Sequence, residues 1–312
     1  MHLALRVGRN LLTVNTSVAS QLQAPPRSDG DPISMLVVGI DKRGRTSHKY
    51  SALDPDLTEG ERADAMLLVV VDPTNRQTRI ITIPRALGVD LPTIGYQRIG
   101  WARQYGGASM LTAAVRDMLG IPIHHYVEFD FQGFAGVVDS LGGVDIDVAT
   151  NMKDWRARLD LSSGWQRLDG LSALGLVRSR SQDVVVDSRQ RKPALGDAGR
   201  SERLVDVIEA LLDRLSEGMK PMKAVSAMLR TSRHVVVDQA MTERDLVQLM
   251  TTVKQSSLRF VDIAVRPSVQ PKDLVSPFPP HQSSGSHYLE FEEPAASFTL
   301  HSERAVLGGG AG

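Results

Sequence analysis

The chain has 312 residues, 42% of them hydrophobic, which is enough for one large domain or two small ones. Lysine plus arginine and aspartate plus glutamate both total 36, and a chain of zero net charge without a long basic run gives little support for nucleic-acid binding. The absence of cysteine excludes disulfides, thiolate metal sites and a cysteine nucleophile.

The two ends of the chain differ in composition from its middle. Residues 1–32 contain one short predicted helix and then a linker rich in Pro, Gly and Asp. Residues 266–312 form a tail rich in Pro, Ser and Gly, and we expect its last residues, 308–312, to be disordered. The start lacks the long apolar core of a signal peptide, and no run of about eighteen apolar residues predicts a membrane helix. We therefore expect a soluble domain over residues 33–265.

Residues 61–85 predict a β-hairpin with a functional site at its open end. Two apolar, β-rich runs flank a turn at residues 72–75, although periodicity alone leaves a buried helix open for the first run. Arg62 and Asp64 precede the first run, and Arg85 follows the second. Because the entry of one antiparallel strand lies beside the exit of its partner, these three charges should meet at one end of the sheet.

Strands and amphipathic helices follow one another along the rest of the domain. Apolar runs and alternation predict the strands, and a period of 3.6 residues predicts the helices. The predicted strands are 35–40, 124–129, 144–148 and 258–265. The predicted helices are 109–119, 131–141, 168–176, one that begins near 196, 221–234 and 242–255, with loops at 42–60, 86–107 and 181–195.

Several polar residues of the predicted strands are candidates for metal binding. Asp41 ends a buried strand, where open α/β sheets often contact ligands. His124 and His125 are adjacent on a strand, so they point to opposite faces and cannot share a metal, which favours structural roles. Asp145 and Asp147 lie on one face of their strand, and ordinary alternation on a half-exposed strand explains both.

Arginines near the two middle helices indicate an anion site. If Arg178 and Arg180 are extended, a period of two residues aims both guanidiniums the same way, and an anion between them would relieve their repulsion. Arg200 lies one turn before Leu204 on the buried stripe of its helix. An arginine facing inward at a helix N-terminus opposes the helix dipole, which a bound anion would explain. An ordinary salt bridge on a surface helix is the alternative.

These segments together resemble the LytR-CpsA-Psr (LCP) family of bacterial envelope glycopolymer transferases. The resemblance covers residues 33–217 and continues more weakly to about residue 265. It rests on Gly39-Ile40-Asp41, Arg62-Ala63-Asp64, Ile83-Pro84-Arg85, Tyr105-Gly106-Gly107, Phe129-Asp130-Phe131, Leu141-Gly142-Gly143, Leu168-Asp169-Gly170, Arg178-Ser179-Arg180 and Gly199-Arg200-Ser201-Glu202-Arg203, in the order of the family.

The resemblance implies an α/β fold, an α-β-α sandwich around a mixed central sheet with an apolar tunnel for a polyprenyl chain. It implies a cell-envelope phosphotransferase that moves a glycopolymer from polyprenyl pyrophosphate to a peptidoglycan hydroxyl, on the extracytoplasmic face of the membrane. Asp41 and Asp64 would ligate Mg²⁺, with Mn²⁺ as the alternative ion. Asp64, Arg62 and Arg85 would be catalytic. The pyrophosphate would be bound by Arg62, Arg85, Arg98, Arg178, Arg180, Arg200 and Arg203.

The sequence also departs from the family at several positions. Ala86 stands where the family often has aspartate, Leu204 where it commonly has glutamine, and Gly100 and Trp101 replace the usual Asn-Ala. We expect these departures to affect activation of the acceptor and the reaction rate more than binding of the pyrophosphate. They keep two alternatives open, namely hydrolysis of the same pyrophosphate and a non-catalytic module that binds the lipid pyrophosphate. The family's N-terminal membrane helix is not found in the sequence.

Overall fold

The computed structural model describes residues 13–15, 30–41, 61–179, 196–216, 234–238, 240–241, 243–263, 265–268, 288–291 and 303–306. The predicted loops at 42–60 and 181–195, most of the predicted helix at 221–234, Arg180 and the glycine-rich end lie outside these residues.

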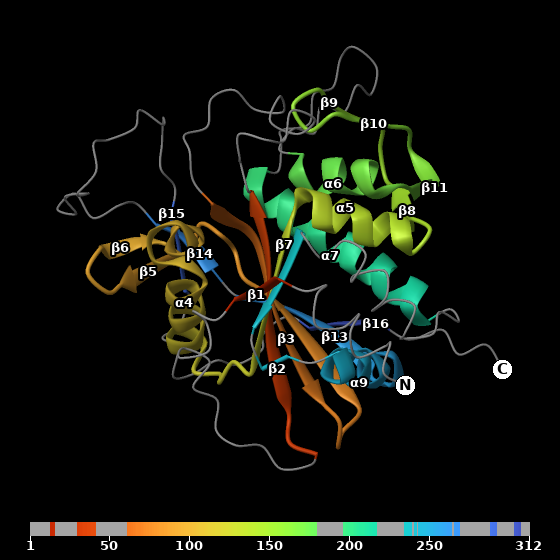
Figure 1. Ribbon diagram of the computed structural model, residues 1–312. Coiled ribbons are helices and arrows are strands. Elements are labelled where there is room, and N and C mark those ends of the chain that lie inside the picture. The colour runs from red at the N-terminus through yellow and green to blue at the C-terminus, as the bar shows by residue number, and fades with distance from the viewer. Residues whose placement is uncertain are drawn as a thin grey trace.

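A mixed sheet forms the middle of the molecule, with its strands in the order β1-β12-β7-β2-β3-β4-β13-β16 (Figure 1). Their bounds are β1 Thr13–Asn15, β12 Val235–Asp238, β7 His125–Asp130, β2 Ile33–Asp41, β3 Arg62–Asp72, β4 Gln77–Thr82, β13 Ser257–Asp262 and β16 Glu303–Val306. β2 is antiparallel to β3 and parallel to β7, which makes the sheet mixed, as expected. Short strands from the two outer segments of the chain, β1 and β16, form its edges.

The described residues also form four two-stranded ribbons outside this sheet. They pair β5 Gly88–Leu91 with β6 Gly95–Arg98, β8 Val144–Val148 with β11 Gly164–Leu168, β9 Met152–Asp154 with β10 Leu159–Leu161, and β14 Val265–Ser268 with β15 Tyr288–Phe291.

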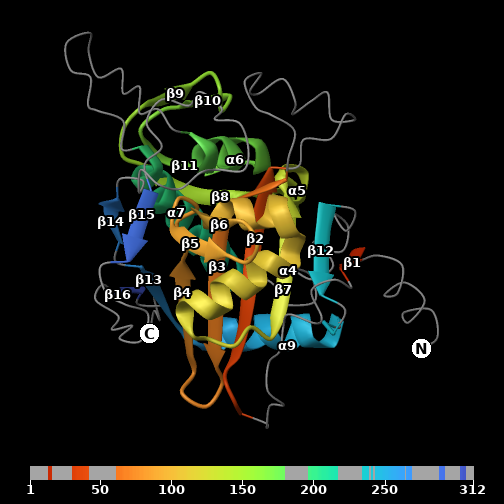
Figure 2. The same cartoon turned by 90° about the vertical axis from the view of Figure 1, so that its left-hand side faces the viewer.

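Helices cover both faces of the sheet. They are α4 Ile99–Leu119, α5 Phe131–Ser140, α6 Gly170–Arg178, α7 Gly196–Ser216 and α9 Glu243–Gln255. α4 packs on one face over a core that includes Leu36, Met66 and Leu111, whereas the other helices lie on the opposite face (Figures 1 and 2). The predicted three-layer α/β arrangement is therefore confirmed. None of the helices in the described part of the chain is long and apolar enough to span a membrane.

The predicted hairpin at residues 61–85 is confirmed as β3 and β4, which excludes the helical alternative for its first run. Asp72 closes the turn, because its carboxylate accepts hydrogen bonds from the backbone N–H of Asn75, at 2.9 Å, and from the Asn75 side-chain amide, at 2.7 Å. These hydrogen bonds hold the pKa of Asp72 below its ordinary value.

Two sequence predictions were wrong at element boundaries. The loop predicted at residues 86–107 contains the strands β5 and β6 and then the first turns of α4, which begins at Ile99 and in which only Gly106 and Gly107 depart from helical backbone angles. Gly107 has a φ of 68°, which glycine adopts at little cost, so the pair kinks the helix without ending it. The strand predicted at 258–265 ends at Asp262, and a second strand begins at Val265.

Asp169 caps α6, and the cap yields a prediction about stability. Its carboxylate accepts a hydrogen bond from the backbone N–H of Ser172 at 2.8 Å, which holds the pKa of Asp169 below its ordinary value. We expect Asp169→Ala to lower the free energy of unfolding by about 1 kcal/mol at pH 7. A lowered carboxylate pKa stabilises the fold above the unfolded pKa, so the difference should shrink as the pH falls below about 4.

Urea titrations of the wild type and the variant at pH 7 and pH 3.5 measure this difference. Asp169→Asn is the matched control, because asparagine is also a good cap but does not titrate. A wild-type advantage over Asp169→Ala that stays constant with pH would contradict the argument.

Candidate functional site

Three charged residues that are distant in sequence meet at one end of the sheet. Asp64 lies near the start of β3, Arg85 just after β4 and Arg200 on α7. The Arg85 Nη1 atom is 2.7 Å from Asp64 Oδ1, and the Arg200 Nη2 atom is 3.4 Å from Asp64 Oδ2. One carboxylate therefore faces two guanidiniums, and the trio keeps one net positive charge.

A β-bulge gives Asp64 its position. Across β2 and β3, Gly39 pairs with Ala65 while Ile40 pairs with Ala63, which leaves Asp64 as an extra residue on β3. Regular alternation from Ala65 would point residue 64 toward α4. The bulge instead puts Asp64 and Ala65 on the same side, the side away from α4.

Asp41 occupies the end of β2, directly opposite Arg62 in the register with β3. Residues 35, 37 and 39 of β2 face away from α4, so alternation puts Asp41 on the same face as Asp64. Asp41 is buried, with 8% of its surface exposed. Two carboxylates on neighbouring strands fit Mg²⁺, which usually binds one or two carboxylates and keeps its other positions for water and phosphate oxygens.

Arg62 is held by the first turns of α4. Its guanidinium lies 4.8 Å from the ring centroid of Trp101, and its Nε donates to Gln104 Oε1 at 3.1 Å. α4 approaches closely because residue 100 is glycine: a Cβ there would lie 2.7 Å from the Ala63 carbonyl oxygen. Gly100 and Trp101, both departures from the family pattern, thus help to position Arg62. Arg98 is the residue just before α4.

Arg178 is the last residue of α6, so the premise that it is extended was wrong. The helix that starts at the Asp169 cap continues two residues further than predicted. The guanidinium of Arg178 lies 4.3 Å from the ring centroid of Phe131, the first residue of α5. The aromatic face attracts the cation and helps to hold the guanidinium in this position.

Arg203 differs from the other predicted arginines, because its contacts are with the backbone of α6. Its Nε donates to the Leu176 carbonyl oxygen at 3.0 Å, and its Nη2 donates to the Ser179 carbonyl oxygen. Only 7% of its surface is exposed. This burial lowers the pKa of the Arg203 guanidinium, against the opposing effect of nearby carboxylates such as Glu202 and Asp154.

An apolar cavity of about 410 Å³ begins at this charged end. It runs between the sheet and the helices on the face away from α4. Charged residues at one end of its lining include Asp64, Asp130, Arg178 and Arg200. Its apolar wall includes Val37, Leu67, Phe134, Leu204, Ile208 and Leu249. The inward direction predicted for Arg200 and the stripe that begins at Leu204 is confirmed.

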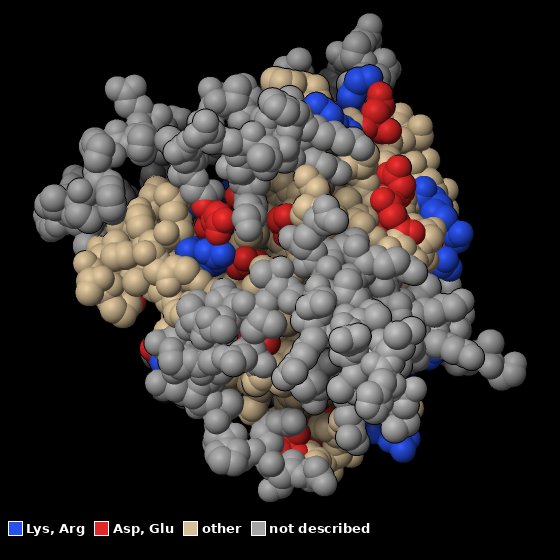
Figure 3. Space-filling model, in the orientation of Figure 1, with Lys and Arg blue, Asp and Glu red and all other residues tan. Residues whose placement is uncertain are grey.

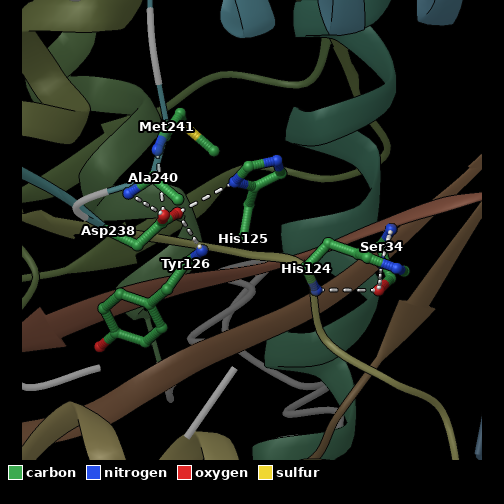
Figure 4. Close-up of polar contacts among 7 residues, drawn as sticks. All are labelled: Ser34, His124, His125, Tyr126, Asp238, Ala240 and Met241. Carbon is green, nitrogen blue, oxygen red and sulfur yellow. Dashed lines mark hydrogen bonds and ion pairs between the residues drawn. The ribbon is translucent and has the colours of Figure 1, made fainter. Parts of the chain in front are cut away.

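The two adjacent histidines point to different partners, as Figure 4 shows. His124 Nδ1 accepts from the backbone N–H of Ser34 at 3.0 Å, and His125 Nδ1 is 3.1 Å from a carboxylate oxygen of Asp238. Asp238 is fully buried and accepts from three backbone N–H groups as well. The predicted structural roles of both histidines are confirmed.

The other predicted carboxylate pair also has an ordinary structural explanation. Asp145 pairs with Arg167 at 2.7 Å on the neighbouring strand, and both side chains are exposed. Among the described residues no group of three or more His, Cys, Asp or Glu side chains could hold a metal ion. On the face shown in Figure 3, the coloured acidic and basic side chains lie beside one another rather than in patches of one sign.

One pair at the charged end of the cavity was not predicted from the sequence. Asp130 caps α5 through Gly133, at 2.8 Å, and its other carboxylate oxygen is 2.8 Å from His234 Nδ1. The capping position was readable from the Asp-Phe-Gln-Gly sequence. Its partner His234 was not predictable, because it lies 104 residues further along the chain.

The amino-acid sequence is similar to those of a known protein family. A sequence profile described as the LytR_cpsA_psr family matches residues 9–289. TagT of Bacillus subtilis (strain 168), named a polyisoprenyl-teichoic acid–peptidoglycan teichoic acid transferase, is 30% identical over 190 residues, which are 59% of this chain and 53% of TagT. The chain therefore spans about half the length of this relative.

Solved structures share the fold. A LytR-Csp2A-Psr enzyme from Actinomyces oris superposes with a TM-score of 0.65 at 24% identity, covering 90% of this chain and 92% of that one. TagT with bound octaprenyl pyrophosphate lipid superposes with a TM-score of 0.59 at 21% identity, covering 89% and 92%.

Proposed function

Because the chain belongs to the LytR-CpsA-Psr family, we propose that it transfers a glycopolymer from a polyprenyl-pyrophosphate carrier to a hydroxyl of peptidoglycan at the cell envelope. The observation that carries the proposal is the apolar cavity that ends at Asp64, Arg178 and Arg200. A polyprenyl pyrophosphate has the same two halves, an apolar chain and a compact anion.

Each half of such a substrate has a complementary surface. The aliphatic wall of the cavity would bind the prenyl chain. The cavity volume of about 410 Å³ falls within the range of roughly 300–1,000 Å³ that is usual for small-molecule pockets. Arg178, Arg200 and Arg85 would bind the pyrophosphate, where planar guanidiniums suit phosphate oxygens. The name of TagT and its structure with octaprenyl pyrophosphate support this assignment.

The metal belongs to the same proposal. Asp41 and Asp64 would hold Mg²⁺, or Mn²⁺, through carboxylate oxygens on one face of the sheet. When bound, the ion would neutralise charge on the phosphate oxygens. Asp64 also holds Arg85 and Arg200 in place, so its removal should disturb both the ion and the arginines.

The proposed reaction is a phosphoryl transfer, and the protein acts mainly by positioning and charge. The acceptor oxygen forms a bond to the phosphorus that carries the glycopolymer. The bond from that phosphorus to the bridging oxygen breaks, polyprenyl phosphate leaves, and the hydroxyl proton passes to solvent or to the leaving group. The arginines stabilise the charge that develops on the phosphate oxygens.

Two measurements test the proposal. Mass spectrometry of lipid that copurifies with the protein should find a polyprenyl phosphate or pyrophosphate. With a polyprenyl-pyrophosphate glycopolymer, peptidoglycan and Mg²⁺, we expect equal amounts of polyprenyl phosphate and of polymer joined to peptidoglycan. Polyprenyl phosphate without joined polymer would instead indicate a pyrophosphatase, and binding without turnover would indicate a lipid-binding module.

A further inference from the structure

The C-terminal end of α6 is held by buried side chains from two other elements. The last carbonyls of a helix lack partners within the helix. Here Arg203 of α7 donates to two of them, the carbonyl oxygens of Leu176, at 3.0 Å, and Ser179. These two residues stand on either side of Val177 and Arg178 in the sequence, so Arg203 holds the backbone before and after the last turn.

Asp154, at the end of β9, holds the same helix end through the side chain of Ser179. Its Oδ2 accepts from the Ser179 hydroxyl at 2.8 Å. Its Oδ1 accepts from the backbone N–H groups of Arg156, at 2.9 Å, and Ala157, at 3.1 Å. Ser179 is fully buried and Asp154 is 5% exposed. Such a network in a low-dielectric interior favours one geometry. We call Asp154, Ser179 and Arg203 the α6 latch.

The α6 latch holds the backbone next to Arg178, the charged residue of this helix end that lines the cavity. Arg178 immediately precedes Ser179, and its guanidinium extends over the Phe131 ring into the cavity lining. Arg200, one turn earlier on α7, also lines the cavity, whereas the described lining does not include Arg203. Two arginines of one helix therefore face different surroundings, Arg200 the cavity and Arg203 the backbone of α6.

We propose that Arg203 is a positioning residue that acts on the pyrophosphate through the α6 latch and Arg178, rather than a ligand of the pyrophosphate itself. The inference rests on the proposed function, because it concerns binding of the same anion. It differs from the role that the family resemblance implies for Arg203. A guanidinium engaged by two backbone carbonyls at this depth supports the helix end instead.

A double-mutant cycle separates the two roles. Arg203→Met removes every hydrogen-bond donor of the side chain at similar length. We expect it to weaken the binding of octaprenyl pyrophosphate with Mg²⁺, measured by calorimetry, roughly tenfold in the wild-type background, about the loss of one charge-assisted hydrogen bond. In the Arg178→Ala background it should cause no further loss, because the group that it positions is already absent. Equal losses in both backgrounds would mean that Arg203 binds the pyrophosphate directly, which would overturn the inference.

A second variant guards against poor folding of Arg203→Met. Ser179→Ala removes the hydroxyl contact with Asp154 but keeps the carbonyl that Arg203 binds. It should weaken binding by a smaller factor, about threefold, and again only when Arg178 is present. A Ser179→Ala effect that is equal with and without Arg178 would likewise count against the α6 latch.

Arg214→Met is the matched control for both variants. Arg214 is also on α7 and donates to a helix-end carbonyl, that of Leu141 at 3.3 Å, but it holds α5 instead of α6. Its loss should leave pyrophosphate affinity unchanged. If the wild type does not bind octaprenyl pyrophosphate at all, the proposed function fails. If the wild type binds and the cycle is additive, only the role of Arg203 is wrong.

Discussion

Replacing Asp64 with asparagine should lower kcat/KM for glycopolymer transfer by roughly 10²–10³-fold, about the effect of removing one preorganised electrostatic group from an active site. Asparagine keeps the shape of the side chain and can still accept a hydrogen bond from Arg85. It removes the negative charge that faces Arg85 and Arg200 and takes away a carboxylate ligand from the proposed metal site. The loss should be accompanied by a higher Mg²⁺ requirement.

The experiment measures initial rates of polyprenyl phosphate release across a Mg²⁺ titration, with circular dichroism to check the fold. Asp145→Asn is the matched control, because Asp145 is also a strand aspartate paired with an arginine, but both partners are exposed. That variant should behave as the wild type. A wild-type rate for Asp64→Asn at limiting Mg²⁺ would show that Asp64 has no catalytic role.

The second large effect concerns thermal stability in the presence of the lipid. A ligand at about 100 times its dissociation constant stabilises the folded state by roughly 2.7 kcal/mol. Each kcal/mol raises the melting temperature of a domain of 150–250 residues by about 2–4 °C, so octaprenyl pyrophosphate with Mg²⁺ should raise it by roughly 5–11 °C. Arg178→Ala/Arg180→Ala should lose most of this shift, because Arg178 lines the cavity and the family resemblance assigns both arginines to the pyrophosphate.

Lysine at both positions should restore only part of the shift, since an ammonium cannot make the bidentate contacts of a guanidinium. Differential scanning fluorimetry with and without the lipid measures each value. Arg156→Ala/Arg158→Ala is the control, because these arginines have the same spacing and are exposed on the turn between β9 and β10. A full shift in the Arg178/Arg180 variant would show that the anion binds elsewhere.

The hairpin shows how much of the site was predictable from sequence. Two β-rich runs, a turn and three flanking charges were enough to predict that Asp64 and Arg85 lie at one sheet end, and they form an ion pair at 2.7 Å. Antiparallel pairing is local, so the turn fixes which residues come together. The inward direction of Arg200 followed in the same way from the apolar period of its helix.

Contacts between distant segments were not predictable in this way. Nothing in the local sequence shows that Arg203 turns toward α6 while Arg200 turns toward the cavity, since the choice depends on how two helices pack. The partner of Asp130, His234, immediately precedes β12, which is the neighbour of β7 in the sheet but lies about a hundred residues later in the chain. The metal and pyrophosphate roles of all the predicted site residues remain predictions.

The β-bulge on β3 separates the chemistry of the site from the packing of the core. Since Asp64 is the extra residue, its side chain has no cross-strand neighbour whose volume it must match. Exchange of this side chain for another leaves the alternation of the apolar residues that follow it undisturbed. Loss of the whole residue would restore regular pairing of Ala63 with Ile40 and of Ala65 with Gly39, so the neighbouring side chains would keep their present faces. The carboxylate of the site is therefore an insertion into a sheet that is regular on both sides of it, so its charge can be lost by substitution or by deletion without turning a core side chain to the other face.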